Sequence, residues 1–225
     1  MGGEVQATKK EYTAKESYRN IGKASSYDEI RYKGIHGRLK NWTKKRAIGK
    51  GLLFIGPIES ILDLPCGTGR FYSFLCKKGY NVFGADISHE MMMVSKNKNR
   101  PYLNHHGYVQ CDAENIPFRD SSIDCILSIR FMFHLPLDVR EKVLSEMHRI
   151  TGRWVIVDFR HSTFKTFIRK VGAFLGLGRE KKRSTLREIR QELAAFGFKV
   201  HKAIQVVPVF SEKVVFVCEK VVSNG

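Results

Sequence analysis

The chain has 225 residues, 43% of them hydrophobic and 27% charged, which suits one α/β domain with a full core and falls short of two. No apolar run reaches the roughly 18 residues of a membrane span, and the first residues lack the apolar core of a secretory signal, so we expect a cytoplasmic protein. Five cysteines without C-x-x-C spacing indicate neither a zinc site nor a disulfide framework.

The net charge of +17 is concentrated in two segments. Residues 1–50 hold 13 Lys/Arg against 5 Asp/Glu, and residues 160–190 hold 10 against 2, whereas the rest of the chain is nearly neutral. Such a distribution is typical of a substrate entrance for an anion, or of a solubilising surface, and charge alone does not choose between them.

The first 50 residues predict a polar start and two helical pieces. Ser25 is the predicted N-cap of the first piece, and we expect the second to end at Gly49 and Gly51. The second piece contains the apolar residues Leu39, Trp42 and Ile48.

Residues 60–70 (SILDLPCGTGR) predict a short buried strand, a glycine-bearing turn and the start of a helix. Gly67 and Gly69 permit a tight turn and the close approach of a ligand to main-chain N–H groups. The next strand ends at Asp86, 23 positions after Asp63. Because a ribose-binding acid follows a nucleotide loop by about 20 residues, we assign Asp86 to a ribose. The chain has neither G-x-G-x-x-G nor G-K-[ST], which argues against dinucleotide and triphosphate sites.

The remaining pattern alternates helices and strands. The continuous apolar run 123–129 is typical of a central parallel strand. Since ligands of open α/β sheets bind outside the carboxyl ends of the strands, we expect residues 130–136 to lie where cofactor and substrate meet. Helices are predicted at 70–78, 90–98, 138–150 and 184–196, and strands at 60–64, 81–88, 108–111, 123–129, 154–159, 198–207 and 213–219.

Residues 60–159 resemble the class I S-adenosylmethionine (SAM)-dependent methyltransferases, specifically the methyltransferase type 11 group that includes ubiquinone and menaquinone biosynthesis enzymes. Asp63, Gly67 and Gly69 fill three places of the family's D-x-G-x-G-x-G motif, and CDAENIPFRDSSIDCILS is a close match. Pro65 replaces the first glycine of that motif, which removes one backbone N–H and fixes φ. The resemblance implies a Rossmann-like, doubly wound seven-stranded sheet whose last strand is antiparallel, with an N-terminal helical extension.

The resemblance also implies SAM as cofactor, S-adenosylhomocysteine as its product, and no metal. In the family the D-A pair binds adenine, so Asp112 and Ala113 take that role, unless Asp112 only caps the following turn. Tyr27 and Arg31 contact the methionine part of SAM or merely pack. The complete cofactor assignment is Tyr27, Arg31, Asp63, Pro65, Cys66, Gly67, Gly69, Asp86, Ile87, Met91, Asp112, Ala113, Ser128 and Arg130.

A hydroxyl acceptor would benefit from a base at the end of the fourth strand, and His134 is the candidate. Asp158 and His161, after the fifth strand, are alternates, and a structural or solvent-facing role is open for all three. Arg130 either binds an anionic acceptor or pairs with a neighbouring carboxylate.

We divide the chain into a basic N-terminal extension that covers the cofactor site (1–50) and a methyltransferase domain (51–225) with a basic amphipathic insertion at 162–183. Within the insertion, apolar residues between 164 and 175 occupy an arc of about 120°, with basic residues elsewhere on the wheel. Such a helix contacts an anionic membrane or lipid-like substrate, closes as a lid, or packs on the core.

These patterns predict methyl transfer to a small-molecule or lipid/glycolipid-like, anionic acceptor, with peripheral contact at the inner membrane surface as a possibility. An RNA methyltransferase is the first alternative because of the positive charge. Against base amino-group methylation, Ser128–Phe131 does not match the [DNS]-P-P-[YFW] motif that holds a flipped base. A non-catalytic SAM-binding protein is the second alternative.

Overall fold

The computed structural model describes residues 34–105, 107–161, 184–207 and 212–221. The first predicted helical piece, with Tyr27 and Arg31, and the amphipathic insertion at 162–183 lie outside the described residues.

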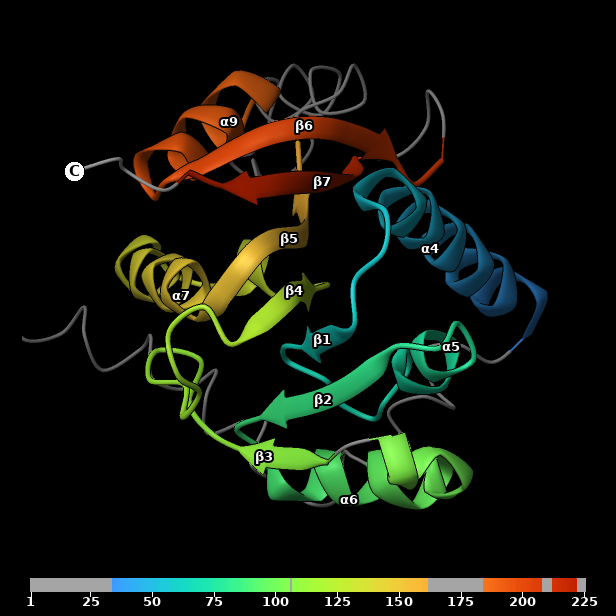
Figure 1. The fold of residues 1–225 in the computed structure, drawn as a ribbon. Helices are drawn as coiled ribbons and strands as arrows, with labels where there is room; N and C mark the ends of the chain where they lie inside the picture. Colours follow the sequence, from blue (N-terminus) through green and yellow to red (C-terminus); the bar gives the residue numbers. More distant parts are fainter. Residues whose placement is uncertain (1–33, 106, 162–183, 208–211, 222–225) are drawn as a thin grey trace, which may run out of the picture.

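A single seven-stranded sheet runs through the described part of the chain in the order β3-β2-β1-β4-β5-β7-β6 (Figure 1). The strands are β1 (Ser60–Asp63), β2 (Asn81–Asp86), β3 (Tyr108–Gln110), β4 (Ile123–Ser128), β5 (Thr151–Arg160), β6 (Phe198–Gln205) and β7 (Lys213–Lys220). Strands β1 to β5 pair in parallel, and β7 is antiparallel to both β5 and β6. The predicted fold class and the antiparallel last strand are confirmed.

Helices cover both faces of the sheet and bury two hydrophobic clusters (Figure 1). One face carries α4 (Gly34–Ile55), α5 (Tyr72–Cys76) and α6 (His89–Lys98), and the other carries α7 (Leu137–Ile150) and α9 (Leu186–Ala195). On the first face, the Tyr108 ring stacks on Tyr72 of α5 at 4.9 Å, and its hydroxyl bonds Ser95 of α6 at 2.7 Å. Two short 3-10 helices, η2 (Arg100–His105) and η3 (Met132–His134), follow α6 and β4.

Helix starts follow the local capping chemistry. The Ser88 hydroxyl accepts a hydrogen bond from the Met91 N–H at 3.2 Å and begins α6. Helix α9 begins with a capping box in which Thr185 and Glu188 exchange hydrogen bonds. The predicted start at Ser184 is therefore one residue early, because only Thr185 has a glutamate at the third following position.

The predicted end of the helix at Gly49 and Gly51 is wrong, since α4 continues to Ile55 and past the division placed after residue 50. A Cβ on Gly51 would lie 3.1 Å from Val217 Cγ2 and 3.3 Å from Ile156 Cδ1. The glycine thus permits close packing of the helix on the sheet, and the burial gained there outweighs its low helix propensity. None of the described helices is long and apolar enough to cross a membrane.

Candidate nucleotide-binding site

A cavity of about 200 Å³ opens at the carboxyl ends of β1, β2 and β4. Its wall comes from the loop after β1, the end of β2, the segment after β3 and the segment after β4. Ten of the predicted site residues line it: Pro65, Cys66, Gly67, Asp86, Ile87, Met91, Asp112, Ala113, Arg130 and His134. These four segments are separate in the sequence and meet at one cavity, because the carboxyl ends of parallel strands lie at the same edge of the sheet.

The Asp86 carboxylate joins the loop after β1 to the start of α6. Its Oδ2 accepts a hydrogen bond from the Gly67 N–H at 2.8 Å, and its Oδ1 accepts one from the Ser88 N–H at 2.9 Å. Burial raises the pKa of Asp86, and these N–H donors oppose that rise. Each oxygen retains a second lone pair, so Asp86 can accept further hydrogen bonds from a ligand in the cavity.

The two glycines of the loop have different roles. Gly67, with φ +51°, lines the cavity, and a Cβ there would meet no atom within 4 Å. Gly69, with φ +69°, does not line it, and a Cβ there would lie 2.0 Å from Ser95 Oγ and 2.3 Å from Asn99 Nδ2. Gly69 permits close contact between the loop and α6, and the approach of a ligand to its main chain stays a prediction.

Asp63 and Ser128, at the ends of β1 and β4, do not line the cavity, although the next residues, Leu64 and Ile129, do. Both are buried, and neither Asp63 Oδ2 nor Ser128 Oγ has a hydrogen-bond partner among the described residues. Burial raises the pKa of Asp63 to about 8, and the nearby Asp86 adds to the rise, whereas Arg70 opposes it. Burial likewise raises the pKa of the Cys66 thiol, which stays protonated as a small apolar wall group.

The segment after β3 carries Asp112 and Ala113 along the cavity. The Asp112 Oδ1 accepts a hydrogen bond from the Glu114 N–H at 3.1 Å, so this side chain also caps its own turn. Capping and ligand binding are compatible here, because Asp112 lines the cavity while it makes this bond.

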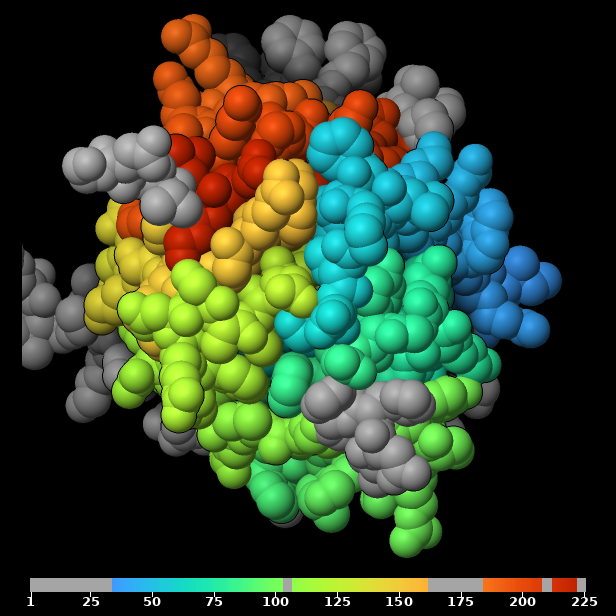
Figure 2. All heavy atoms as spheres, in the orientation of Figure 1, coloured from blue at the N-terminus to red at the C-terminus, as the bar shows by residue number. Residues whose placement is uncertain are grey.

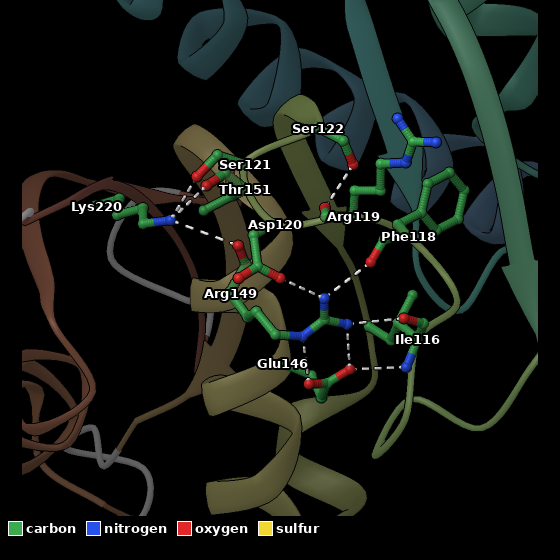
Figure 3. A network of polar contacts seen from close by, with 10 residues as sticks. All are labelled: Ile116, Phe118, Arg119, Asp120, Ser121, Ser122, Glu146, Arg149, Thr151 and Lys220. Atoms are coloured by element: carbon green, nitrogen blue, oxygen red, sulfur yellow. Dashed lines mark hydrogen bonds and ion pairs between the residues drawn. The ribbon is translucent and has the colours of Figure 1, made fainter.

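Arg149 of α7 holds the end of this segment through several hydrogen bonds (Figure 3). Its guanidinium donates to the carbonyl oxygens of Ile116 and Phe118 and to Asp120, each at 2.8 Å. The same group pairs with Glu146, which accepts the Ile116 N–H at 2.7 Å. The sequence interpretation did not include Arg149. Its i,i+3 spacing from Glu146 indicates an ion pair, but nothing in the sequence indicates which loop the pair would hold.

The end of β4 is held to β5 by Asp158. The Arg130 N–H donates to Asp158 Oδ1, and the Lys44 ammonium of α4 donates to Asp158 Oδ2. Arg130 has φ +65°, a conformation that a non-glycine residue adopts at a cost of about 1–3 kcal/mol. Asp158 is fully buried and does not line the cavity, and His161, also buried, does not line it either. Of the three proposed bases, only the exposed His134 in η3 reaches the cavity.

Positive charge gathers beside the same end of the sheet. Arg70 and Arg130 line the cavity, and Arg160 of β5 lies directly opposite Lys213 of β7. The Arg160 guanidinium also lies 4.4 Å from the centre of the Phe133 ring. Burial lowers the pKa of Lys213 to about 8, and the neighbouring Lys44, Arg160 and Arg130 lower it further.

The β3-β2-β1-β4-β5-β7-β6 sheet, with a glycine-bearing loop after β1 and an acid at the end of β2, defines a Rossmann-like fold. Residues 62–153 match the model of the methyltransferase domain family. This part of the chain is similar to that family.

Two relatives illustrate the similarity in sequence. The ubiquinone/menaquinone biosynthesis C-methyltransferase of Hahella chejuensis is 32% identical over 175 residues, which cover 71% of this chain and 65% of the relative. The malonyl-[acyl-carrier protein] O-methyltransferase of Pectobacterium atrosepticum is 31% identical over 121 residues, which cover 51% of this chain and 44% of the relative. The chain thus spans less than two thirds of the length of either relative.

Solved structures share the fold at low identity. The magnesium protoporphyrin IX methyltransferase of Synechocystis, with bound S-adenosylhomocysteine, superimposes with a TM-score of 0.74 at 16% identity, covering 92% of this chain and 98% of that one. The 1,6-didemethyltoxoflavin-N1-methyltransferase of Burkholderia thailandensis superimposes with a TM-score of 0.68 at 14% identity, covering 95% of this chain and 90% of that one. These likenesses agree with the seven-stranded methyltransferase fold.

Proposed function

We propose that this chain is a SAM-dependent methyltransferase that acts on a small-molecule acceptor bearing an anionic group. The observation that carries the proposal is the convergence of Gly67, Asp86 and Asp112 on one cavity at the carboxyl ends of β1, β2 and β3. A relative with the same domain transfers a methyl group in quinone biosynthesis, and a structural neighbour binds S-adenosylhomocysteine.

The residues present fit SAM. Gly67 leaves open space at the wall, where a side chain would intrude, and its N–H points toward the Asp86 carboxylate. Asp63 and Ser128, each followed by a residue that lines the cavity, carry buried polar atoms without partners among the described residues, as expected where a polar ligand completes a site. Asp86 would hold the ribose hydroxyls, Asp112 and Ala113 the adenine, and Ile87 and Met91 the adenine face. Bound SAM would supply a methyl group already activated by its sulfonium.

The protein's own task is then to position an acceptor and exclude water. His134 is the base we propose for a hydroxyl acceptor, because it is the candidate that reaches the cavity. Arg70 and Arg130, with Arg160 and Lys213 behind them, favour an acceptor that carries a carboxylate or phosphate. A lipid-linked acceptor remains within this proposal, as does membrane contact through residues 162–183.

The test is calorimetric titration of the full chain with SAM and, separately, with NAD. We expect micromolar SAM affinity, no NAD binding, and a loss of tenfold or more in SAM affinity for Asp86→Ala. Glu141→Ala, which removes an exposed acid of α7 outside the cavity, is the matched control and should bind SAM normally. Failure of the wild type to bind SAM would refute the proposal.

SAM binding without transfer to any acceptor would support the non-catalytic alternative. Methyl transfer to RNA, with no transfer to anionic small molecules or lipids, would support the RNA methyltransferase. A screen with radiolabelled SAM, run in parallel on anionic small molecules, lipid extracts and RNA, separates these outcomes.

A further inference from the structure

Helix α4 has apolar residues on two opposite sides. Those that face the sheet, Ala47, Ile48, Leu52 and Ile55, are buried. Four others, which we call the outer stripe, are exposed by 81%, 52%, 57% and 80% of their surface: Ile35, Leu39, Trp42 and Leu53. Leu39 and Trp42 therefore lie on a different side of the helix from Ile48.

The outer stripe is straight and long. At 100° per residue, its four side chains fall within an arc of about 60°, and from Ile35 to Leu53 they extend along about 27 Å of the helix axis. Figure 2 shows α4, in blue to cyan, along the surface on one side of the molecule. Ile35, Leu39 and Trp42 follow one another within two helical turns, and Leu53 lies farther along, after Arg46. Exposed apolar residues grouped in this way mark a contact site, whereas isolated ones do not.

The charged residues of α4 are all basic. Helix α4 contains no Asp or Glu, and it exposes Arg38 and Lys50, which flank the stripe, and Arg46, which lies in the stripe between Trp42 and Leu53. The Arg46 guanidinium lies 5.6 Å from the centre of the Trp42 ring. Next to Leu53, the half-exposed Phe54 has the Lys202 ammonium 5.0 Å from its ring centre. Aliphatic, aromatic and basic groups thus alternate along the whole helix.

We infer that α4 is a membrane-contact helix, whose outer stripe enters the interface of a bilayer with anionic headgroups while its flanking basic residues bind those headgroups. A helix with an apolar stripe, an aromatic residue and Lys/Arg flanks lies in the plane of such an interface. This inference does not depend on the methyl acceptor, and it uses a different surface from residues 162–183.

The other possible occupants fit less well. A second copy would bring two acid-free, basic helices together at a symmetric contact, where like charges repel. A nucleic acid would use the basic residues and Trp42 but would gain little from Ile35, Leu39 and Leu53, because aliphatic groups do not stack on bases. An anionic bilayer uses every group of the surface.

Co-sedimentation of the full chain with phosphatidylglycerol-containing vesicles, and with phosphatidylcholine vesicles as the neutral control, tests the inference. Of the two tryptophans, Trp42 is exposed and Trp154 is buried, so a blue shift of emission on binding reports on α4. We expect binding and a blue shift with the anionic vesicles only. Both should weaken as the salt concentration rises.

Two variants separate the apolar and the basic contributions. Ile35→Ser with Leu39→Ser should lower vesicle affinity about tenfold or more, because each buried aliphatic side chain contributes about that factor. Arg38→Gln, Arg46→Gln and Lys50→Gln together should remove the preference for anionic lipid. The matched controls are Met93→Ser with Leu186→Ser, and Lys96→Gln, Arg100→Gln and Arg119→Gln, all exposed and outside α4.

Unchanged SAM affinity and melting temperature of each variant would confirm that it is folded. The inference is overturned if the wild type does not bind anionic vesicles at low salt, or if the α4 variants bind these vesicles as well as the control variants do. It is also overturned if Phe167→Glu with Ile168→Glu alone abolishes binding and the blue shift. Concentration-dependent dimerisation lost in the apolar variant would assign α4 to a second copy, and RNA binding without vesicle binding would assign it to nucleic acid.

Discussion

Asp63 is a carboxyl group with almost no access to water, at the end of the strand that leads into the loop. Its pKa is raised to about 8 by burial, whereas the same group ionises near pH 4 in an unfolded chain. Between these values the folded protein binds one more proton than the unfolded chain, so this group's contribution to stability falls as the pH rises.

Asp63→Asn removes that dependence, because an amide does not ionise. We expect the melting temperature of the variant minus that of the wild type to increase from about pH 5 to about pH 8 and to stay constant above about pH 8. Thermal unfolding of both proteins across this range measures the difference. A constant difference at all pH values would contradict the raised pKa.

The same group should report on ligand binding. A cationic ligand in the cavity stabilises the ionised carboxylate of Asp63, so SAM binding near pH 7 should release protons. Calorimetry in two buffers of different ionisation enthalpy measures this release, which Asp63→Asn should abolish. Proton release that persists in the variant would assign it to another group.

Gly67 and Gly69 should respond differently to the same added methyl group. Gly69→Ala places its Cβ within 2.0 Å of Ser95 Oγ in a left-handed conformation, and we expect a loss of about 2–4 kcal/mol in the free energy of unfolding. Gly67→Ala meets open space and should cost about 1 kcal/mol, while SAM affinity falls tenfold or more. Denaturant unfolding and calorimetry measure the two effects, and equal stability of the variants would argue against the packing role of Gly69.

At the scale of elements, α7 supports the site through Arg149, which does not itself line the cavity. Arg149→Lys keeps the charge but loses the fork that holds two carbonyl oxygens and Asp120 together (Figure 3). We expect a loss of about 1–3 kcal/mol in stability and a severalfold loss in SAM affinity, because the segment with Asp112 loosens. Arg153→Lys, which alters an exposed ion pair with Glu219, should change neither by a comparable amount. SAM affinity equal to wild type in Arg149→Lys would remove Arg149 from this role.

At the scale of the whole molecule, one buried ion pair fastens α4 to the sheet. Lys44 and Asp158 are 2% and 0% exposed, and Asp158 also holds the backbone of Arg130. Lys44→Met leaves a buried carboxylate uncompensated, and we expect a loss of about 3–5 kcal/mol in the free energy of unfolding. Adding Asp158→Asn should restore part of that loss, because the amide is neutral and still accepts a hydrogen bond. Additive losses in the double variant would contradict the pairing.

Much of the fold follows from local signals. The apolar runs of β1, β4 and β5, the loop at Gly67 and the interval to Asp86 each carry a pattern that a single segment determines, and the structure confirms the parallel sheet they predict. Element ends were less predictable. Helix α4 runs through two glycines because its contact with Val217 and Ile156 depends on strands far away in the sequence.

The sequence by itself determined the class of fold and the segments that meet at the cavity, because hydrophobic period and loop chemistry are local properties. Only the tertiary structure decided what each residue there faces: Gly69 faces α6, Asp158 pairs with Lys44, and Arg149 holds a loop some 30 residues earlier in the chain. It also decided that Leu39 and Trp42 point away from the core. The reason is physical, since burial and partners depend on which surfaces come together, and the sequence pattern of one helix does not specify them.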